Sequence, residues 1–247
     1  MVKLYREDVL DFPLDKWQRE AFLDFDEKIT HKTFRFPCIP AYQGYKLNQL
    51  RFGFADDPRK EKAALELANL LEAYGATSKD MGVYTALIVF FKTPPDLKNL
   101  YNVYDFEQIF WKLLNRVNLF DKEEWIESIS TNPDHSSWEY CFNRERYFMY
   151  CATPAHRNRK SRYFPTFMLA ITPRWVLEEF SASQEKADRM KEMIRKRLVD
   201  YDEVPPHPEL KWYGGPDNFE WKQYYLRDND STLPACPFKH VWKKQDE

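Results

Sequence analysis

The chain has 247 residues, 43% of them hydrophobic and 17% aromatic, which is enough to bury one substantial core. Its formal net charge is only −2, from 37 basic and 39 acidic residues, so no global field attracts DNA, RNA or an anionic membrane. The N-terminus is charged within its first six residues, unlike a secretory signal, and the longest uncharged apolar run, residues 81–91, is shorter than the ~20 residues of a membrane helix. We therefore expect one cytoplasmic domain spanning residues 1–247, with neither a nucleic acid nor a membrane as its partner.

The N-terminal part of the chain predicts two helices separated by an irregular stretch. Residues 15–29 carry apolar side chains at helical spacing and predict a helix that packs through that stripe. Pro37 and Pro40 interrupt the aromatic-rich stretch that follows, which indicates extended pieces and turns. The second helix is expected to begin with Asp57 as its N-cap and Pro58 in the first helical position, and to end at Gly75.

The middle of the chain predicts a buried strand followed by a helix. Residues 83–91, "VYTALIVFF", are continuously apolar and rich in β-branched and aromatic types, as in a central strand covered on both faces. Residues 105–117 place their apolar side chains on one helical face after a capping Asp105.

The C-terminal half predicts a hairpin, a further strand and a long helical region. "WEYCF" and "YFMYCA", joined by "NRER", are typical of an antiparallel hairpin, and "TFMLAI" predicts another strand. A helix should then begin at Thr172 and Pro173 and continue, with a break near Ser181, to about residue 199. The last fifty residues are rich in proline and aromatics and are expected to wrap the core irregularly. The predicted fold class is therefore α+β, a single domain with a mostly antiparallel central sheet packed by helices.

The strongest local feature is the basic stretch "CATPAHRNRKSR", residues 151–162. His156 lies among four cations, Arg157, Arg159, Lys160 and Arg162, directly behind an apolar strand. Arginine forks suit carboxylate or phosphate, and a histidine held neutral by nearby cations can bind a metal. The alternative is a solvated basic turn. The position of the basic stretch between two apolar strands favours a site for a bound acid.

Two of the four cysteines have unusual neighbours. Cys38 lies in "FPCIPA" and Cys236 in "PACPF", where prolines fix the course of the backbone. A thiolate held in this way can ligate haem iron, whereas the alternative is a small packed hydrophobe. No CxxC pair is present, so the cysteines do not predict a zinc or redox motif.

Four stretches taken together resemble the YqcI/YcgG-like family. They are "FPCIPAYQGYKLNQLRFGF", "WEYCFNRERYFMYCATPAHRNRKSRYFPTF", "LKWYGGPDNFEWKQYYLRDND" and a C-terminal "CPF", and they occur in the family's order over most of the chain. Members with an assigned role include haem-dependent N-hydroxylases of guanidines, in D-cycloserine and guanitoxin assembly. The resemblance therefore implies a haem-dependent monooxygenase that N-hydroxylates the guanidine group of arginine or an arginine-derived metabolite.

The resemblance also implies cofactors and site residues. Haem b would be the cofactor and dioxygen the co-substrate, with reducing equivalents from an electron donor. His156 would be the proximal iron ligand, and Arg157, Arg159 and Arg162 would pair with the haem propionates. Cys38 and Cys236 stay alternative ligands, and a nonhaem iron site that combines His156 with carboxylates is a further alternative.

A guanidinium substrate is a planar cation, so it should be bound by carboxylates and aromatic faces. Glu139, Glu220, Trp138 and Trp221 stand in the matching stretches and suit that task, although tryptophans are more often core residues and a strand glutamate usually faces solvent. Two other functions stay open at this point. They are a non-catalytic haem-binding or haem-sensing protein, and a binding module for a small acidic metabolite.

Overall fold

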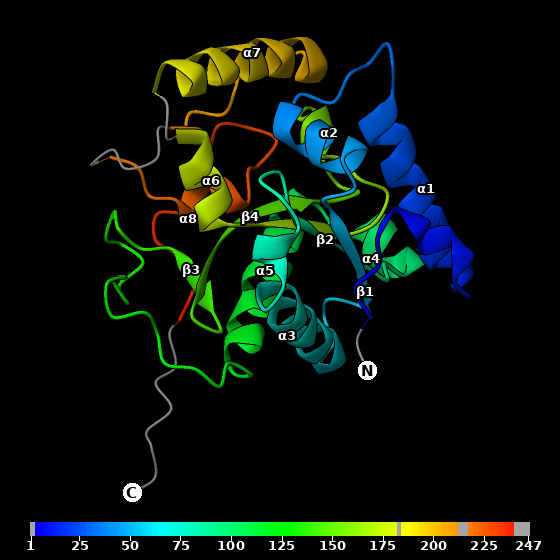
Figure 1. The fold of residues 1–247 in the computed structure, drawn as a ribbon, viewed down its shortest axis with the longest axis horizontal. Coiled ribbons are helices and arrows are strands. Elements are labelled where there is room, and N and C mark those ends of the chain that lie inside the picture. The colour runs from blue at the N-terminus through cyan, green and yellow to red at the C-terminus, as the bar shows by residue number, and fades with distance from the viewer. Residues whose placement is uncertain (1–2, 182–183, 212–216, 240–247) are drawn as a thin grey trace, which may run out of the picture.

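A computed structural model describes residues 3–181, 184–211 and 217–239. In this part of the chain five strands form one mixed sheet in the order β1-β2-β5-β4-β3 (Figure 1). The pair β1–β2 is parallel, and the pairs β2–β5, β5–β4 and β4–β3 are antiparallel, so the predicted α+β class with a mostly antiparallel sheet is confirmed. The strands are β1 Arg51–Ala55, β2 Leu87–Phe91, β3 Tyr140–Phe142, β4 Glu145–Ala152 and β5 Met168–Pro173.

Helices cover both faces of the sheet. They are α1 Lys16–Thr30, α2 Ile39–Lys46, α3 Glu61–Gly75, α4 Pro95–Leu100, α5 Val103–Asn118, α6 Arg174–Ser181, α7 Gln184–Asp202 and the short α8 Trp221–Tyr224. The described ranges also contain three 3₁₀ turns, at Glu7–Asp11, Ser78–Asp80 and Lys160–Arg162. Figure 1 shows α3 and α5 together on one side of the sheet and α1 and α2 on the other. No helix in the described ranges is long and apolar enough to cross a membrane.

Strand β2 explains why both faces are covered. Leu87, Val89 and Phe91 pack with α3 and α5 in one apolar cluster, whereas Ile88 and Phe90 pack with α1 in the other. Successive side chains of a strand point to opposite faces of the sheet, and both faces are covered here, so all five residues are buried. The continuous apolar run in the sequence therefore predicted correctly that this strand is interior, although the strand is shorter than residues 83–91.

Several predicted boundaries are wrong, each for a local reason. Helix α3 begins at Glu61 rather than after Asp57: the Asp57 carboxylate accepts from the Arg59 N–H over 3.0 Å and binds the Arg59 guanidinium at 2.6 Å, but residues 58–60 form a turn before the helix. Helix α5 begins at Val103, with Asn102 as its N-cap and Asp105 completing the capping box.

Two further differences involve prolines. The stretch after Pro37 forms helix α2 rather than only extended pieces, since Pro40 occupies a first-turn position where its missing N–H costs nothing. Pro173 ends strand β5 instead of starting a helix, and α6 begins at Arg174.

The hairpin and the C-terminal segment follow the sequence prediction. Strands β3 and β4 pair antiparallel around Asn143 and Arg144, whose positive φ angles of 51° and 57° suit a tight hairpin turn. After α7, the described part of the segment is largely irregular and buries Trp221, Tyr224, Tyr225 and Phe238 in the core. The C-terminal segment thus wraps the sheet on the α3–α5 face, and it meets the loop that follows β4.

Candidate functional site

The basic loop, residues 153–162, leaves the end of β4 and returns beside it. Thr153 and Tyr163 form an isolated parallel bridge, and the Thr153 N–H donates to the Arg162 carbonyl over 3.0 Å. The Ser161 N–H and hydroxyl donate to the Asp202 carboxylate, at the end of α7, over 2.6 and 2.9 Å. The loop is therefore tied at its base to the sheet and at its side to α7.

His156 is a buried link between the basic loop and the C-terminal segment. Its exposed fraction is 1%. Nδ1 lies 2.9 Å from the Thr153 hydroxyl, and Nε2 lies 2.8 Å from the Leu226 carbonyl. Because a carbonyl can only accept, Nε2 carries the proton and Nδ1 accepts from the hydroxyl. Burial lowers the pKa of His156 to about 4, against a smaller opposing effect of the Leu226 carbonyl.

Arg159 is likewise engaged by the chain itself. Its guanidinium donates to the carbonyls of Arg227 and Pro205, both at 2.9 Å, and to the Asp230 carboxylate at 2.7 Å. The residue is 3% exposed. The anion that this cation meets is therefore a carboxylate of the C-terminal segment.

Arg162 and Arg157 have opposite environments. Arg162 is buried, donates to the carbonyls of Tyr224 and Gln223 over 3.1 and 3.2 Å, and lies 4.2 Å from the Tyr150 ring centre. Arg157 is exposed, and its Nη1 donates to the Pro154 carbonyl over 2.9 Å. Only Arg157 of the three predicted arginines therefore faces solvent.

These contacts decide whether the loop suits a haem. Both ring nitrogens of His156 are bonded within the protein, so neither is available to iron. Arg159 and Arg162 already use their forks on buried partners and cannot also reach propionates. The loop as it stands does not fit a haem ligated by His156, and no reaction step is built on iron there.

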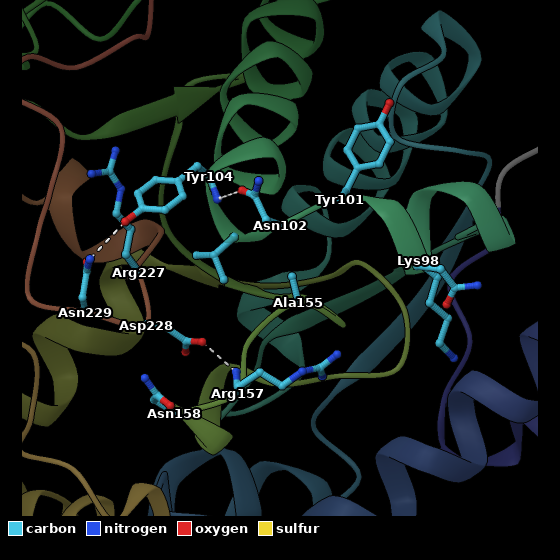
Figure 2. A pocket seen from close by; sticks show the side chains of 12 residues that line it. Lys98, Tyr101, Asn102, Tyr104, Ala155, Arg157, Asn158, Arg227, Asp228 and Asn229 are labelled. Atoms are coloured by element: carbon cyan, nitrogen blue, oxygen red, sulfur yellow. Dashed lines mark hydrogen bonds between the residues drawn. The ribbon is translucent and has the colours of Figure 1, made fainter.

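A pocket of about 700 Å³ lies beside the loop, between it and the start of α5. Lys98, Tyr101 and Tyr104 contribute from the α4–α5 side, and Arg157, Arg227 and Asp228 from the other. Figure 2 shows Lys98 at one end of the opening and Tyr104 and Asp228 toward the other, with Ala155 at its floor. Four asparagines add amide groups to the wall. We call this the loop pocket.

The loop pocket carries both signs of charge in fixed places. The Asp228 carboxylate accepts from the backbone N–H groups of Arg157 and Arg159 over 2.7 and 3.1 Å, which holds it at the wall. Lys98 is exposed and makes no ion pair within the described ranges. The pocket can therefore accept an anionic group near Lys98 and a cationic group near Asp228.

The wall of the loop pocket already binds one guanidinium. Arg227 donates to the Glu107 carboxylate over 2.8 Å and lies 4.8 Å from the Tyr104 ring centre. A carboxylate and an aromatic face together are the partners expected for a guanidinium.

The predicted guanidinium-binding residues lie elsewhere. Glu139 and Glu220 are buried around the chain's own Arg174, whose Nε donates to Glu139 over 2.9 Å and whose Nη2 donates to Glu220. Trp138 and Trp221 belong to the core on the α3–α5 face, and Trp221 contacts Trp111. The structure does not bring these four residues to the loop pocket.

The two cysteine alternatives lie on opposite faces of the sheet. Cys38 is half-buried at the N-cap of α2, and burial raises the pKa of its thiol while the N–H of Ala41 opposes that rise. Cys236 packs against the core of the α3–α5 face, where burial raises its pKa to about 12. In the ranges that the structure describes, no three His, Cys, Asp or Glu side chains come together as metal ligands.

Sequence reasoning missed most residues of the loop pocket. Lys98, Tyr104 and Asp228 come from three segments that only the fold brings together. The stretch "LRDND" was part of the family match, and its cluster of short polar residues behind an aromatic run was the available signal.

The buried His156 predicts a pH dependence of stability. The unfolded chain binds a proton on this ring below pH 6.5, whereas the folded chain binds it only below about pH 4. The contribution of this group to the free energy of unfolding is therefore complete above pH 6.5. It is lost as the pH falls to 4, which lowers the free energy of unfolding by about 3 kcal/mol. Urea unfolding at pH 7, 5.5 and 4.5 measures the fall.

The matched variant for this prediction is His156→Gln, which is less stable at pH 7 but lacks the titrating ring. Its free energy of unfolding should change less between pH 7 and 4.5 than that of the parent. An equal pH dependence in both proteins would show that His156 is not the group responsible.

Comparisons with known proteins agree on one family. The sequence model of the YqcI/YcgG family matches residues 25–239. "Uncharacterized protein YqcI" of Bacillus subtilis (strain 168) is 47% identical over 99% of this chain and 99% of its own length. "Uncharacterized protein YcgG" of the same strain is 46% identical over 92% of this chain and 90% of its own length.

A more distant relative has a name that describes an activity. "Putative N(omega)-hydroxy-L-arginine synthase DcsA" of Streptomyces lavendulae is 27% identical over 96% of this chain and 89% of its own length. No solved structure matches the chain.

Proposed function

This chain belongs to the YqcI/YcgG family, and from that premise we propose that it hydroxylates a guanidine nitrogen of arginine or of an arginine-derived metabolite. The observation that carries the proposal is the loop pocket, which has an exposed cation, Lys98, at one end and a fixed carboxylate, Asp228, toward the other. An extended arginine has the same order of charges, with a carboxylate at one end and a guanidinium at the other. The name of the Streptomyces relative supports the same substrate class.

The proposed reaction needs dioxygen and a two-electron donor. One oxygen atom is inserted into an N–H bond of the guanidine to give N–OH. The other oxygen atom takes two electrons and two protons and leaves as water. Within the loop pocket, Lys98 would bind the carboxylate of the amino acid, and Asp228 would orient the guanidinium.

Haem b is part of this proposal, and when bound it would supply the activation of dioxygen. His156 does not fit as its ligand in this fold, so we propose the thiol of Cys38 as the iron ligand instead. Burial raises the pKa of this thiol, so its thiolate would form only on coordination, which removes the thiol proton. Absorption of the reduced protein under carbon monoxide tests this assignment. Cys38→Ala should abolish a thiolate-type band that His156→Gln retains, and the reverse result would reject Cys38.

The proposal itself is tested by turnover. Haem-reconstituted protein with oxygen and a reductant should convert arginine to a product heavier by one oxygen atom, seen by mass spectrometry. If no guanidine in a panel of arginine, agmatine and guanidinoacetate is consumed, the proposed activity is rejected. Uptake of haem without any spectral response to these guanidines would favour a haem-binding or haem-sensing protein instead.

Lys98 provides a substrate-specific test of the loop pocket. Lys98→Met should raise the KM for arginine roughly tenfold, a difference of about 1.4 kcal/mol. The KM for agmatine, which lacks the carboxylate, should stay the same. Lys112→Met, an exposed residue of α5 outside the pocket, is the matched control. Equal changes in KM for both substrates would contradict the proposed orientation.

A further inference from the structure

A second cleft, of about 400 Å³, lies where the end of α1 and the start of α2 meet α7. Its basic lining residues are His31, Lys32, Arg35 and Arg197. The residues that line it include no aspartate or glutamate, although the whole chain has a net charge of −2. We call this the basic cleft. Figure 1 shows α7 lying beyond α2, on the side of the molecule away from α3.

The cations of the basic cleft have no carboxylate partners in residues 3–181, 184–211 and 217–239. Within the part of the chain that the structure describes, Lys32, Arg35 and Arg197 form no ion pair. Among the residues that the structure describes, Arg35 bonds only through its Nε, which donates to the Lys32 carbonyl over 3.2 Å, and both terminal nitrogens of its fork are unused there. Like charges gathered without acids repel one another, and a bound anion would relieve that repulsion.

The floor of the basic cleft is apolar and held by its own fold. Ile29 is buried in the core that lies under α1, and Phe36, Ile39 and Tyr42 continue the apolar surface toward solvent. Pro37 and Pro40 set the course of the chain between α1 and α2. A ligand here would meet apolar side chains below and cations at the rim, which is the pattern of small-molecule sites.

We propose that the basic cleft binds an organic anion whose carboxylate or phosphate pairs with Arg35 and Arg197 and whose apolar body lies on Phe36 and Ile39. Arginine forks suit both kinds of acid, because two parallel N–H groups match two oxygens. The site is distinct from the loop pocket, which is built from α4, α5 and the basic loop. The inference therefore does not depend on the proposed hydroxylation of guanidines.

Calorimetric titration with three probes of one shape tests the charge requirement. The probes are 2-naphthoate, 2-naphthyl phosphate and 2-naphthylmethylamine, which share an aromatic body and differ in charge. Both anions should bind, and the amine should bind at least tenfold more weakly. Tighter binding of the phosphate than of the carboxylate identifies a phosphorylated ligand, and the opposite order identifies a carboxylic acid. Absence of binding by both anions, or equal binding of the amine, would overturn the proposal.

Charge reversal places the ligand in the cleft. The double variant Arg35→Glu with Arg197→Glu should weaken binding of both anions at least tenfold, with little change in the unfolding midpoint, because Arg35 is exposed and Arg197 is only half-buried. Lys112→Glu, on the exposed face of α5, is the control with a matched type of charge change and should bind as the parent does. Arginine, the proposed substrate, should not displace 2-naphthoate. Unchanged affinity in the double variant would show that the anions bind elsewhere.

Discussion

Replacing Arg174 by methionine is expected to lower the free energy of unfolding by about 3 to 5 kcal/mol. The Arg174 side chain is 1% exposed, and its partners Glu139 and Glu220 are each 4% exposed. Removal of the guanidinium leaves two carboxylates buried close together, where both desolvation and mutual repulsion oppose their charged forms. Urea unfolding at pH 7 measures the loss.

Second substitutions separate this cause from a simple loss of packing. Glu139 keeps a second cation, since Arg146 lies 3.6 Å from its carboxylate. Besides Arg174, Glu220 accepts from the Tyr224 hydroxyl over 2.6 Å. A neutral hydroxyl stabilises a buried carboxylate less than the Arg146 cation beside Glu139 does. In the Arg174→Met background, Glu220→Gln should therefore restore more stability than Glu139→Gln. If Arg174→Met costs less than about 1 kcal/mol, the buried charges are not coupled as described.

This cluster shows what the sequence could and could not predict. The argument that Glu139 and Glu220 suit a guanidinium was chemically sound, and both do bind one. That guanidinium belongs to Arg174, which is 35 and 46 residues away from them in the chain. Pairings at this separation are set by the sheet and by the return of the C-terminal segment, and no local pattern contains them.

The elements that were predicted best are those whose pattern is local. The hairpin of β3 and β4 and the interior strand β2 follow from alternation and from an apolar run. Helix α2 was missed because Pro37 and Pro40 were read as breaks, although proline in a first turn is compatible with a helix. The loop pocket was missed because its charges come from separate segments.

The basic loop illustrates the same limit with two arginines that are five positions apart. Sequence pattern treats Arg157 and Arg162 as equivalent partners for an anion. In the fold, Arg162 is buried against backbone carbonyls and the Tyr150 ring, whereas Arg157 is exposed at the loop pocket. A pair of identical substitutions at these positions can therefore distinguish a structural cation from one that is available to a ligand.

Arg162→Met is expected to lower the free energy of unfolding by about 3 kcal/mol, since it leaves buried carbonyls without a donor and removes the contact with Tyr150. Arg157→Met should change it by less than about 0.5 kcal/mol, because Asp228 binds the Arg157 backbone N–H and not its side chain. Amide hydrogen exchange should quicken around residues 220–227 only in Arg162→Met. Similar losses in both variants would mean that the loop is held by its summed charge. A large loss at Arg162 alone would mean that its specific contacts hold the loop and leave Arg157 free for an anion in the pocket.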